Sequence, residues 1–344
     1  LVDTTRKMLA DFFNGSDPNR LCFSYNSTDA LNLIIFGTLQ KGDHAISTTL
    51  EHNSVLRPLN HQNKFNGVEV DFVPFGANGF VDPDDIKNKI KANTRLVIVN
   101  HASNVLGTLQ PLKAIGQICR QQGVPFAIDA SQSAGKVPID IEKMQVDIVA
   151  FTGHKSLLGP TGIGGLYVRR GIMVWPLLDG GVQENNKRAG TENLLGIIGM
   201  AMAAEMAKRK LPERMAHLEM LKSKLISELP KHIDEYIINT PSEFSLPNLL
   251  SVSIKYIEGE SVMLMLDDDD IAVSTRSACA TGSLRASHVL ISIGLSHADA
   301  QGTLVITLGR DNTEDQINRF LKSLRNVVKT LRDISPLYRK ISQS

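Results

Sequence analysis

Lys155 and Asp129 are the two residues of this sequence whose types and positions most clearly suggest catalysis. Asp129 ends the apolar run VPFAID (124–129), and Lys155 follows the run VDIVAFT (146–152) by three residues. A lysine in a desolvated, cation-flanked pocket becomes a nucleophilic amine, and a buried carboxylate favours the protonated form of a ring nitrogen beside it. Together they match the needs of pyridoxal-5′-phosphate (PLP), which has an aldehyde to bind and a ring that must stay protonated.

A phosphate group could bind where a second polar segment opens a helix. The segment SYNSTDALN (24–32) follows a short strand, and the free N–H groups at a helix N-terminus favour an anion. Ser27 and Thr28 add hydroxyls, although the same two residues could form an ordinary helix cap. His52 follows the run HAISTT (44–49), where its imidazole could either stack on an aromatic cofactor or be a loop histidine without a role.

These candidate residues lie in a region where short β-branched runs alternate with amphipathic stretches. Strand character recurs at 44–49, 68–75, 94–100, 124–129, 146–152 and 164–170, and helical spacing near 28–39, 54–64, 82–91 and 111–123. This alternation predicts an α/β fold with a mostly parallel sheet covered on both faces. Ligands of such folds bind beyond the carboxyl ends of the strands, which is where Asp129 and Lys155 stand.

The pattern changes after a long helix expected over 192–229 and interrupted at Pro212. Strands at 249–257, 271–275 and 304–309 and a helix at 313–333 predict a second, α+β domain. We therefore expect a large domain over 15–210 and a small domain that comprises 211–344 together with the amphipathic helix of residues 1–14. A chain of 344 residues suits two such domains better than one core.

Composition narrows the class of protein. The formal net charge is +1, so no overall field favours nucleic acid or an anionic membrane. No run approaches the roughly 18 apolar residues of a membrane helix. The three cysteines, at positions 22, 119 and 279, are widely spaced, which argues against a disulfide framework or a zinc cluster and predicts a reducing cytoplasm.

Several segments resemble the PLP-dependent fold-type-I enzymes of the class V aminotransferase group. They are EHNSVLRPL, HASNVLGTLQP, IDASQSAGKVPID and FTGHKSLLGPTGIGGLYVRR, and they occur in the family's order. Two further segments, GGVQENNKRAGTEN and STRSACATGS, are similar to its NifS/IscS-type cysteine desulfurases. The resemblance runs from about residue 5 to the end. It implies PLP as cofactor and conversion of L-cysteine to L-alanine, with the sulfur passed on for iron–sulfur cluster or thio-cofactor assembly.

The resemblance also implies a role for each site residue. Lys155 would hold the cofactor as an imine and then remove the α-proton of the substrate. Asp129 would pair with the ring nitrogen, and His52, also a catalytic candidate, would stack on the ring. The other cofactor contacts would be Asn104 and Gln132 near the phenolic oxygen, Ser27, Thr28, Thr152 and His154 at the phosphate, and Thr191 at the phosphate of a partner subunit, which implies a homodimer.

Cys279 decides the reaction that the resemblance implies. It lies in the small, polar segment SACATGS (277–283), which is typical of a mobile loop, and a thiolate there could attack the substrate sulfur and carry it as a persulfide to an acceptor or scaffold protein. Without the resemblance, a loop cysteine with no role would be the simpler interpretation. Cys22 and Cys119 fall in an expected strand and helix, and we expect both to be packing residues.

The sequence departs from the family pattern at three places. A Leu-Asp-Asn-Ala-Ala-Thr-Thr-like segment that touches substrate does not precede Leu1, Val305 replaces the usual carboxylate-binding arginine, and Arg276 replaces a glycine. We expect Arg276 to bind the substrate carboxylate, with Asn104 beside it, or to lower the pKa of Cys279. The alternatives are a selenocysteine lyase, another class V enzyme such as a transaminase, and a catalytically impaired sulfur-transfer scaffold that lacks the N-terminal substrate loop.

Overall fold

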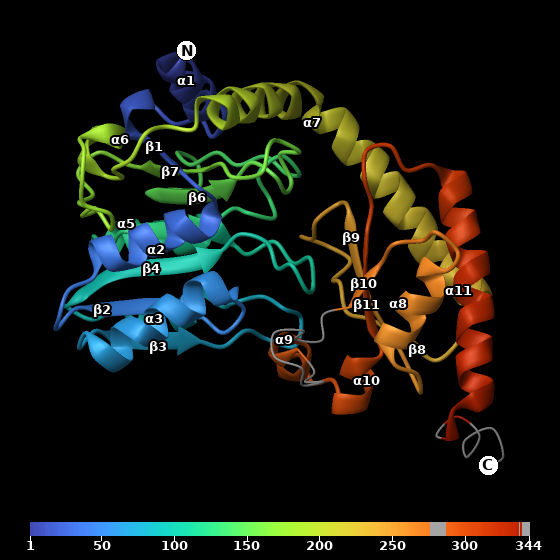
Figure 1. Cartoon of the computed structure of the whole chain (residues 1–344). Coiled ribbons are helices and arrows are strands. Elements are labelled where there is room, and N and C mark those ends of the chain that lie inside the picture. The colour runs from blue at the N-terminus through green and yellow to red at the C-terminus, as the bar shows by residue number, and fades with distance from the viewer. Residues whose placement is uncertain (276–286, 337, 339–344) are drawn as a thin grey trace. The chain divides into compact units, whose positions relative to one another are not determined.

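The computed structural model describes residues 1–275, 287–336 and 338, and the chain divides into two compact units (Figure 1). The first unit comprises residues 1–75, 80–103 and 109–211. The second comprises 76–79, 104–108 and the described residues from Pro212 onward. The predicted α/β class, with a mostly parallel sheet in the larger part, is confirmed.

Seven strands form the sheet of the first unit, in the order β1-β7-β6-β5-β4-β2-β3. The five strands β6, β5, β4, β2 and β3 run parallel, whereas β7 pairs antiparallel with both β6 and β1. Their bounds are β1 Leu21–Ser24, β2 His44–Thr48, β3 Glu69–Val73, β4 Thr94–Asn100, β5 Phe126–Asp129, β6 Ile148–Thr152 and β7 Gly164–Val168.

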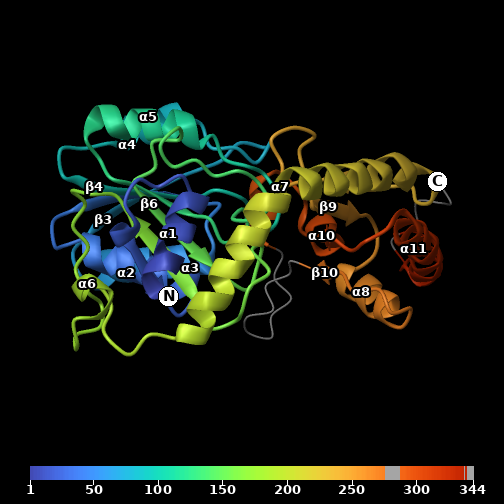
Figure 2. The same cartoon turned by 90° about the horizontal axis from the view of Figure 1, so that it is seen from above.

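Helices cover both faces of this sheet (Figure 2). On one face, α2 and α3 bury an apolar cluster with the inward residues of the strands, among them Ile98 of β4 and Ala127 of β5. On the opposite side lie α4 and α5. Asn100 follows Ile98 by two residues, and Asp129 follows Ala127 by two residues. Because side chains alternate along a strand, both therefore face the α2 side as well. The helices are α2 Ser27–Thr38, α3 Asn53–Phe65, α4 Pro83–Lys89, α5 Leu112–Gln122 and the short α6 Gln183–Asn186.

The N-terminal helix belongs to the first unit, so its expected place in the small domain is wrong. In α1 (Val2–Phe12), Leu9 and Ala10 are fully buried, and so is Phe13, whose ring centroid lies 4.8 Å from that of Phe151 in β6. Arg6 also donates to the carbonyl of Leu21 at 2.6 Å. The amphipathic pattern of this segment shows that one face is buried but does not show against which unit.

The long helix α7 (Leu194–Glu228) runs through the boundary between the units, and Pro212 does not interrupt it as expected. Pro212 lies on the exposed side of the helix. Before it, Met200 and Ala204 are buried, and after it Leu218 and Leu221 are buried. We infer that packing on both sides of the proline outweighs the one hydrogen bond that it removes.

The second unit is built on an antiparallel sheet in the order β10-β11-β9-β8. Its core joins β9 and β11 to α8, α11 and the second half of α7. None of the described helices combines the length and the apolar character that crossing a bilayer requires. The elements are β8 Tyr236–Ile238, β9 Leu249–Ile254, α8 Gly259–Asp267, β10 Ser274–Thr275, α9 His288–Ser292, α10 His297–Gln301, β11 Thr303–Thr307 and α11 Glu314–Ile334.

Candidate functional site

The carboxyl ends of β4, β5 and β6 bring the predicted catalytic residues to one edge of the sheet. Asn100 pairs in register with Asp129, and Asp129 pairs with Ala150. Thr152 ends β6, and Lys155 follows it by three residues. Since neighbouring parallel strands end at the same edge, Asp129 and Lys155 belong to adjacent strand ends, as a site that flanks one ring requires.

Asp129 is buried and is held by two serines. The Ser131 amide donates to Oδ1 at 2.9 Å, and the Ser131 hydroxyl lies 2.5 Å from the same oxygen and 2.6 Å from the hydroxyl of Ser27. A chain of hydroxyls therefore links the first residue of α2 to this carboxylate. Every hydrogen bond that reaches Asp129 within the described part of the chain goes to Oδ1, which leaves Oδ2 to accept a donor from a ligand.

The N-terminus of α2 is capped by Asn26, so the interpretation of Ser27 and Thr28 as ordinary caps is wrong. The side chain of Asn26 accepts from the amide of Asp29 at 3.0 Å. The hydroxyl of Ser27 is thereby left for the Asp129 cluster, and Thr28 is exposed in the first turn. The opening turn of a helix carries amides without intrahelical acceptors, and here it stands next to the carboxylate site.

The loop after β6 presents Lys155. Gly153 donates to the carbonyl of Ile163 at 3.0 Å and accepts from Gly159 at 2.7 Å, which closes the loop at its base. Ser156 donates to the carbonyl of Gln132 at 2.6 Å, tying this loop to the one after β5. The side chain of Lys155 is exposed, so the expected desolvation does not come from its described neighbours in the first unit.

Gly135 allows these two loops to approach each other closely. Its φ of +90° lies in the region that glycine favours, and a Cβ there would stand 2.7 Å from the carbonyl oxygen of Ser156. Any side chain at this position would push the Lys155 loop away from the loop that carries Gln132. The glycine in the AGK motif after Asp129 therefore has a structural reason.

Two histidines lie at the same edge. Thr152 is buried, and its hydroxyl lies 3.0 Å from Nδ1 of His154, which is exposed. His52 is the N-cap of α3, where its Nδ1 accepts from the Ser54 amide at 3.1 Å while the residue as a whole stays exposed. Its ring is thus anchored through Nδ1, and the predicted stacking stays a prediction.

Other predicted residues belong to the second unit or lie outside the described part of the chain. Asn104 belongs to the second unit, so its contact with the cofactor stays a prediction. Val305, also of the second unit, is buried in β11 between Ser251 of β9 and Ser274 of β10. Cys279 and Arg276 lie outside the described residues. No group of three or more metal-binding side chains occurs among the residues that the structure places.

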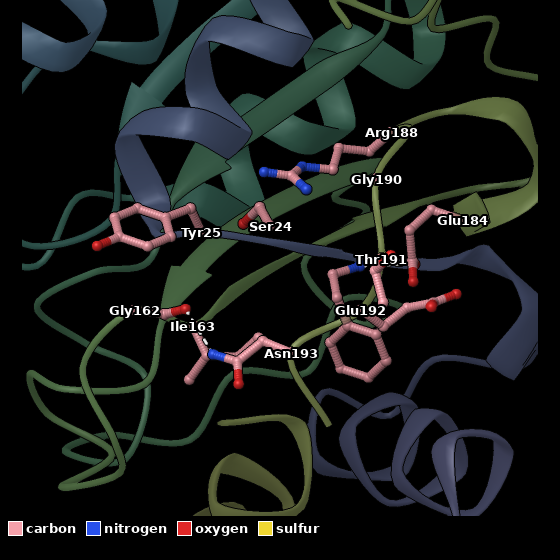
Figure 3. Close-up of a pocket in the computed structure, with 11 residues that line it drawn as sticks. Ser24, Tyr25, Gly162, Ile163, Glu184, Arg188, Gly190, Thr191, Glu192 and Asn193 are labelled. Carbon is pink, nitrogen blue, oxygen red and sulfur yellow. Dashed lines mark hydrogen bonds between the residues drawn. The ribbon is translucent and has the colours of Figure 1, made fainter. Parts of the chain in front are cut away.

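Thr191 lines a pocket of about 180 Å³ near the end of β1 (Figure 3). Arg188 lies 3.5 Å from Asp29 of α2. Asn193 closes another side by donating to the carbonyl of Gly162 at 3.1 Å. Thr191 is exposed, which fits a residue expected to contact something outside its own chain.

Glu184, which lines this pocket, forms a buried ion pair with Arg6. Glu184 accepts two hydrogen bonds from the guanidinium of Arg6, at 2.7 and 2.8 Å, and one from the amide of Phe23 at 2.8 Å. The Glu184 side chain is only 2% exposed and that of Arg6 is 9% exposed. The pair therefore fixes α1, β1 and α6 to one another.

We expect Glu184→Ala to lower the free energy of unfolding by about 3–5 kcal/mol, because it leaves the Arg6 guanidinium buried without its counter-ion. Urea denaturation of the purified variant measures the effect. Glu228→Ala, which removes a surface carboxylate paired with Lys231, is the matched control and should change little. Equal effects of the two substitutions would contradict the prediction.

Sequence reasoning missed three polar residues that the fold buries at the strand ends. Ser131 follows Asp129 by two residues, a spacing that favours a bond to the carboxylate. Burial lowers the pKa of His101 to about 4, so this histidine is neutral at the end of β4. Burial raises the pKa of Glu51 to about 8. Apart from the spacing of Ser131 from Asp129, the signal in the sequence was that each residue stands within three residues of the end of a strand.

Comparisons with known proteins agree with this geometry. The model of the aminotransferase class-V family matches residues 1–320. Cysteine desulfurase IscS of Dictyoglomus turgidum is 38% identical over 339 residues, which are 97% of this chain and 85% of the relative. Cysteine desulfurase IscS 1 of Archaeoglobus fulgidus is 38% identical over 344 residues, 99% of this chain and 89% of the relative.

Solved structures show the same similarity. A NifS-like protein superposes with a TM-score of 0.87 at 33% identity, covering 96% of this chain and 88% of its own. The apo structure of a cysteine desulfurase from Thermococcus onnurineus gives a TM-score of 0.84 at 28% identity, covering 96% of this chain and 84% of the other. The resemblance inferred from the sequence motifs is confirmed.

Proposed function

The chain belongs to the class-V aminotransferase family, and on this premise we propose that it is a PLP-dependent cysteine desulfurase. It converts L-cysteine to L-alanine and keeps the removed sulfur as a persulfide on Cys279. The observation that carries the proposal is that Asp129 and Lys155 follow adjacent strands while Ser27, at the start of α2, contacts Asp129, in a chain 38% identical to proteins named cysteine desulfurase along nearly its whole length.

The residues present fit PLP. The free Oδ2 of buried Asp129 suits a protonated ring nitrogen, and the opening turn of α2 suits a phosphate. Thr28, Thr152 and His154 would hold that phosphate together with Ser27. His52 would cover the ring, Gln132 and Asn104 would stand near the phenolic oxygen, and Lys155 would bond covalently to the aldehyde carbon.

Each residue contributes a separate part of the chemistry. When bound, PLP supplies an electron sink, because its protonated ring accepts the electron pair left by a departing proton. The carboxylate of Asp129 keeps that ring protonated. The amine of Lys155, displaced by the amine of the substrate, takes the α-proton as a general base.

Sulfur transfer is the task of Cys279. Its thiolate attacks the sulfur of the substrate cysteine, so a new S–S bond forms while the Cβ–S bond breaks and leaves its electron pair on the carbon side. A proton then completes the methyl group of alanine, and Cys279 holds the sulfur as a persulfide. No external oxidant is needed, because the carbon skeleton is reduced as the transferred sulfur is oxidised.

Substrate and protein partners complete the proposal. With Val305 in place of the usual arginine, Arg276 binds the substrate carboxylate. Thr191, at its pocket near β1, contacts the phosphate in a second copy of the chain, so the active enzyme is a homodimer. A sulfur-acceptor or scaffold protein takes the persulfide sulfur for iron–sulfur cluster or thio-cofactor assembly. A reducing cytoplasm suits this chemistry and the free thiols of Cys22 and Cys119.

The test is a visible spectrum of the protein reconstituted with PLP, followed by an assay for alanine and sulfide from L-cysteine with a thiol reductant. We expect a yellow protein that releases both products in equal amounts. Asp129→Asn should retain the fold and lose about 10²–10⁴-fold in rate, because the amide cannot hold the ring nitrogen protonated. A yellow protein that forms neither alanine nor sulfide would overturn the proposed substrate.

A further inference from the structure

Glu51 is a buried acid at the site that the proposed chemistry does not use. It lies between the end of β2 and the start of α3, directly before His52, and only 2% of its surface is exposed. A carboxyl group in such a position must be either strongly paired or uncharged. Its hydrogen bonds show which of the two applies.

All the donors around Glu51 converge on one of its two oxygens. Oε1 accepts from the Thr48 hydroxyl at 2.7 Å, the Asn100 amide at 2.9 Å and the Asn100 side chain at 3.4 Å. Oε2 is buried and has no hydrogen-bond partner in the described structure. An ionised carboxylate would leave a buried anionic oxygen without a donor, which costs more free energy than the neutral O–H group that a carboxylic acid would place at the same position.

The charges around Glu51 favour the same state. Asn100, which bonds to Glu51, pairs in register with Asp129, and the negative charge of Asp129 adds to burial in raising the pKa of Glu51 to about 8. His101, the next residue in the chain after Asn100, is buried and neutral, so it supplies no compensating cation. His52, the first residue after Glu51, is exposed and turned to the Ser54 amide.

We propose that Glu51 is a positioning residue that stays uncharged at neutral pH, ties the end of β4 to the end of β2, and adds no second negative charge next to Asp129. The role toward the cofactor rests on the proposed function. The protonation state does not, because it follows from contacts within the chain. The two parts are therefore tested by separate measurements.

The protonation state is tested on the apoprotein by urea unfolding of the wild type and Glu51→Gln from pH 5 to pH 8. The folded state holds the proton to a higher pH than the unfolded state, so its stabilising effect is present at low pH and is lost as the pH rises. The unfolding constant of the wild type, relative to Glu51→Gln, should rise about tenfold per pH unit across this window. Glu205→Gln, at an exposed position of α7, should give a flat ratio.

If the ratio of the unfolding constants of the wild type and Glu51→Gln did not change with pH, Glu51 would be ionised in both the folded and the unfolded state, and the proposal would be overturned.

The positioning role is tested by the affinity of the apoprotein for added PLP, followed by absorbance at pH 6.5. Glu51→Gln should stay within about threefold of the wild type, whereas Glu51→Ala, which removes the tie to Asn100, should bind about tenfold more weakly.

Equal losses of affinity in Glu51→Gln and Glu51→Ala would show that a charge, rather than a neutral acceptor, is required, and unchanged affinity in both would show that Glu51 does not position the site. Either result overturns the positioning role. A wild-type protein that binds no PLP would instead refute the proposed function, while the unfolding ratio would still decide the protonation state.

Discussion

Replacing Lys155 with alanine should lower the rate of alanine formation from L-cysteine by about 10⁴-fold or more, because one substitution removes both the covalent anchor of the cofactor and the general base. The fold should survive, since the Lys155 side chain is exposed and the loop is held by Gly153 and Ser156 rather than by the lysine. Single-turnover assays with excess enzyme measure the loss without interference from product release.

Borohydride reduction followed by peptide mass spectrometry provides the second measurement for Lys155. The mass of reduced PLP should appear on the peptide that contains Lys155 in the wild type and be absent from Lys155→Ala. Lys143→Ala, which removes an exposed lysine of the same unit, should behave as the wild type in both assays. Retention of cofactor mass elsewhere in Lys155→Ala, together with full activity, would refute the assignment of the anchor.

The sheet of the first unit was predictable because its strands are short apolar runs separated by amphipathic segments. Each of the six strands expected between residues 44 and 170 is present, with ends within a few residues of the expected ones. The second unit was harder to predict: β8, of three residues, was missed, and the strand expected at 271–275 contains only the two residues of β10. Strands this short carry no periodic signal, and their pairing with β9 and β11 defines them.

The rule that ligands of α/β folds bind beyond the carboxyl ends of the strands could locate the site, but it could not show which of its polar residues are buried. Asp129, Thr152, His154 and Lys155 were found because each follows an apolar run, and the structure brings them to one edge. Glu51 was missed because a sequence shows that an acid follows a strand but not that the fold excludes water from it. Whether water reaches the carboxyl group determines whether the residue carries a charge.

Two of the three cysteines are unsuited to act as the sulfur carrier on physical grounds. A nucleophilic cysteine must be accessible and partly ionised. Cys22 in β1 and Cys119 in α5 are buried, and burial raises the pKa of each thiol to about 12. At neutral pH almost none of either thiol is ionised, and neither can reach a substrate. The expectation that both are packing residues agrees with this burial, and Cys279 is the cysteine that remains.

Cys279→Ser should therefore abolish sulfide release while leaving the bound PLP spectrum unchanged, because a serine hydroxyl cannot take up the sulfur atom. Cys22→Ala and Cys119→Ala are the matched controls, and each should keep the wild-type rate per folded molecule despite some loss of stability. Mass spectrometry after one turnover should find an added sulfur only on the Cys279 peptide. If Cys279→Ser still turned over L-cysteine to a keto acid, transamination would be the reaction; if it still released sulfide at the wild-type rate, the thiol of Cys279 would not be the carrier.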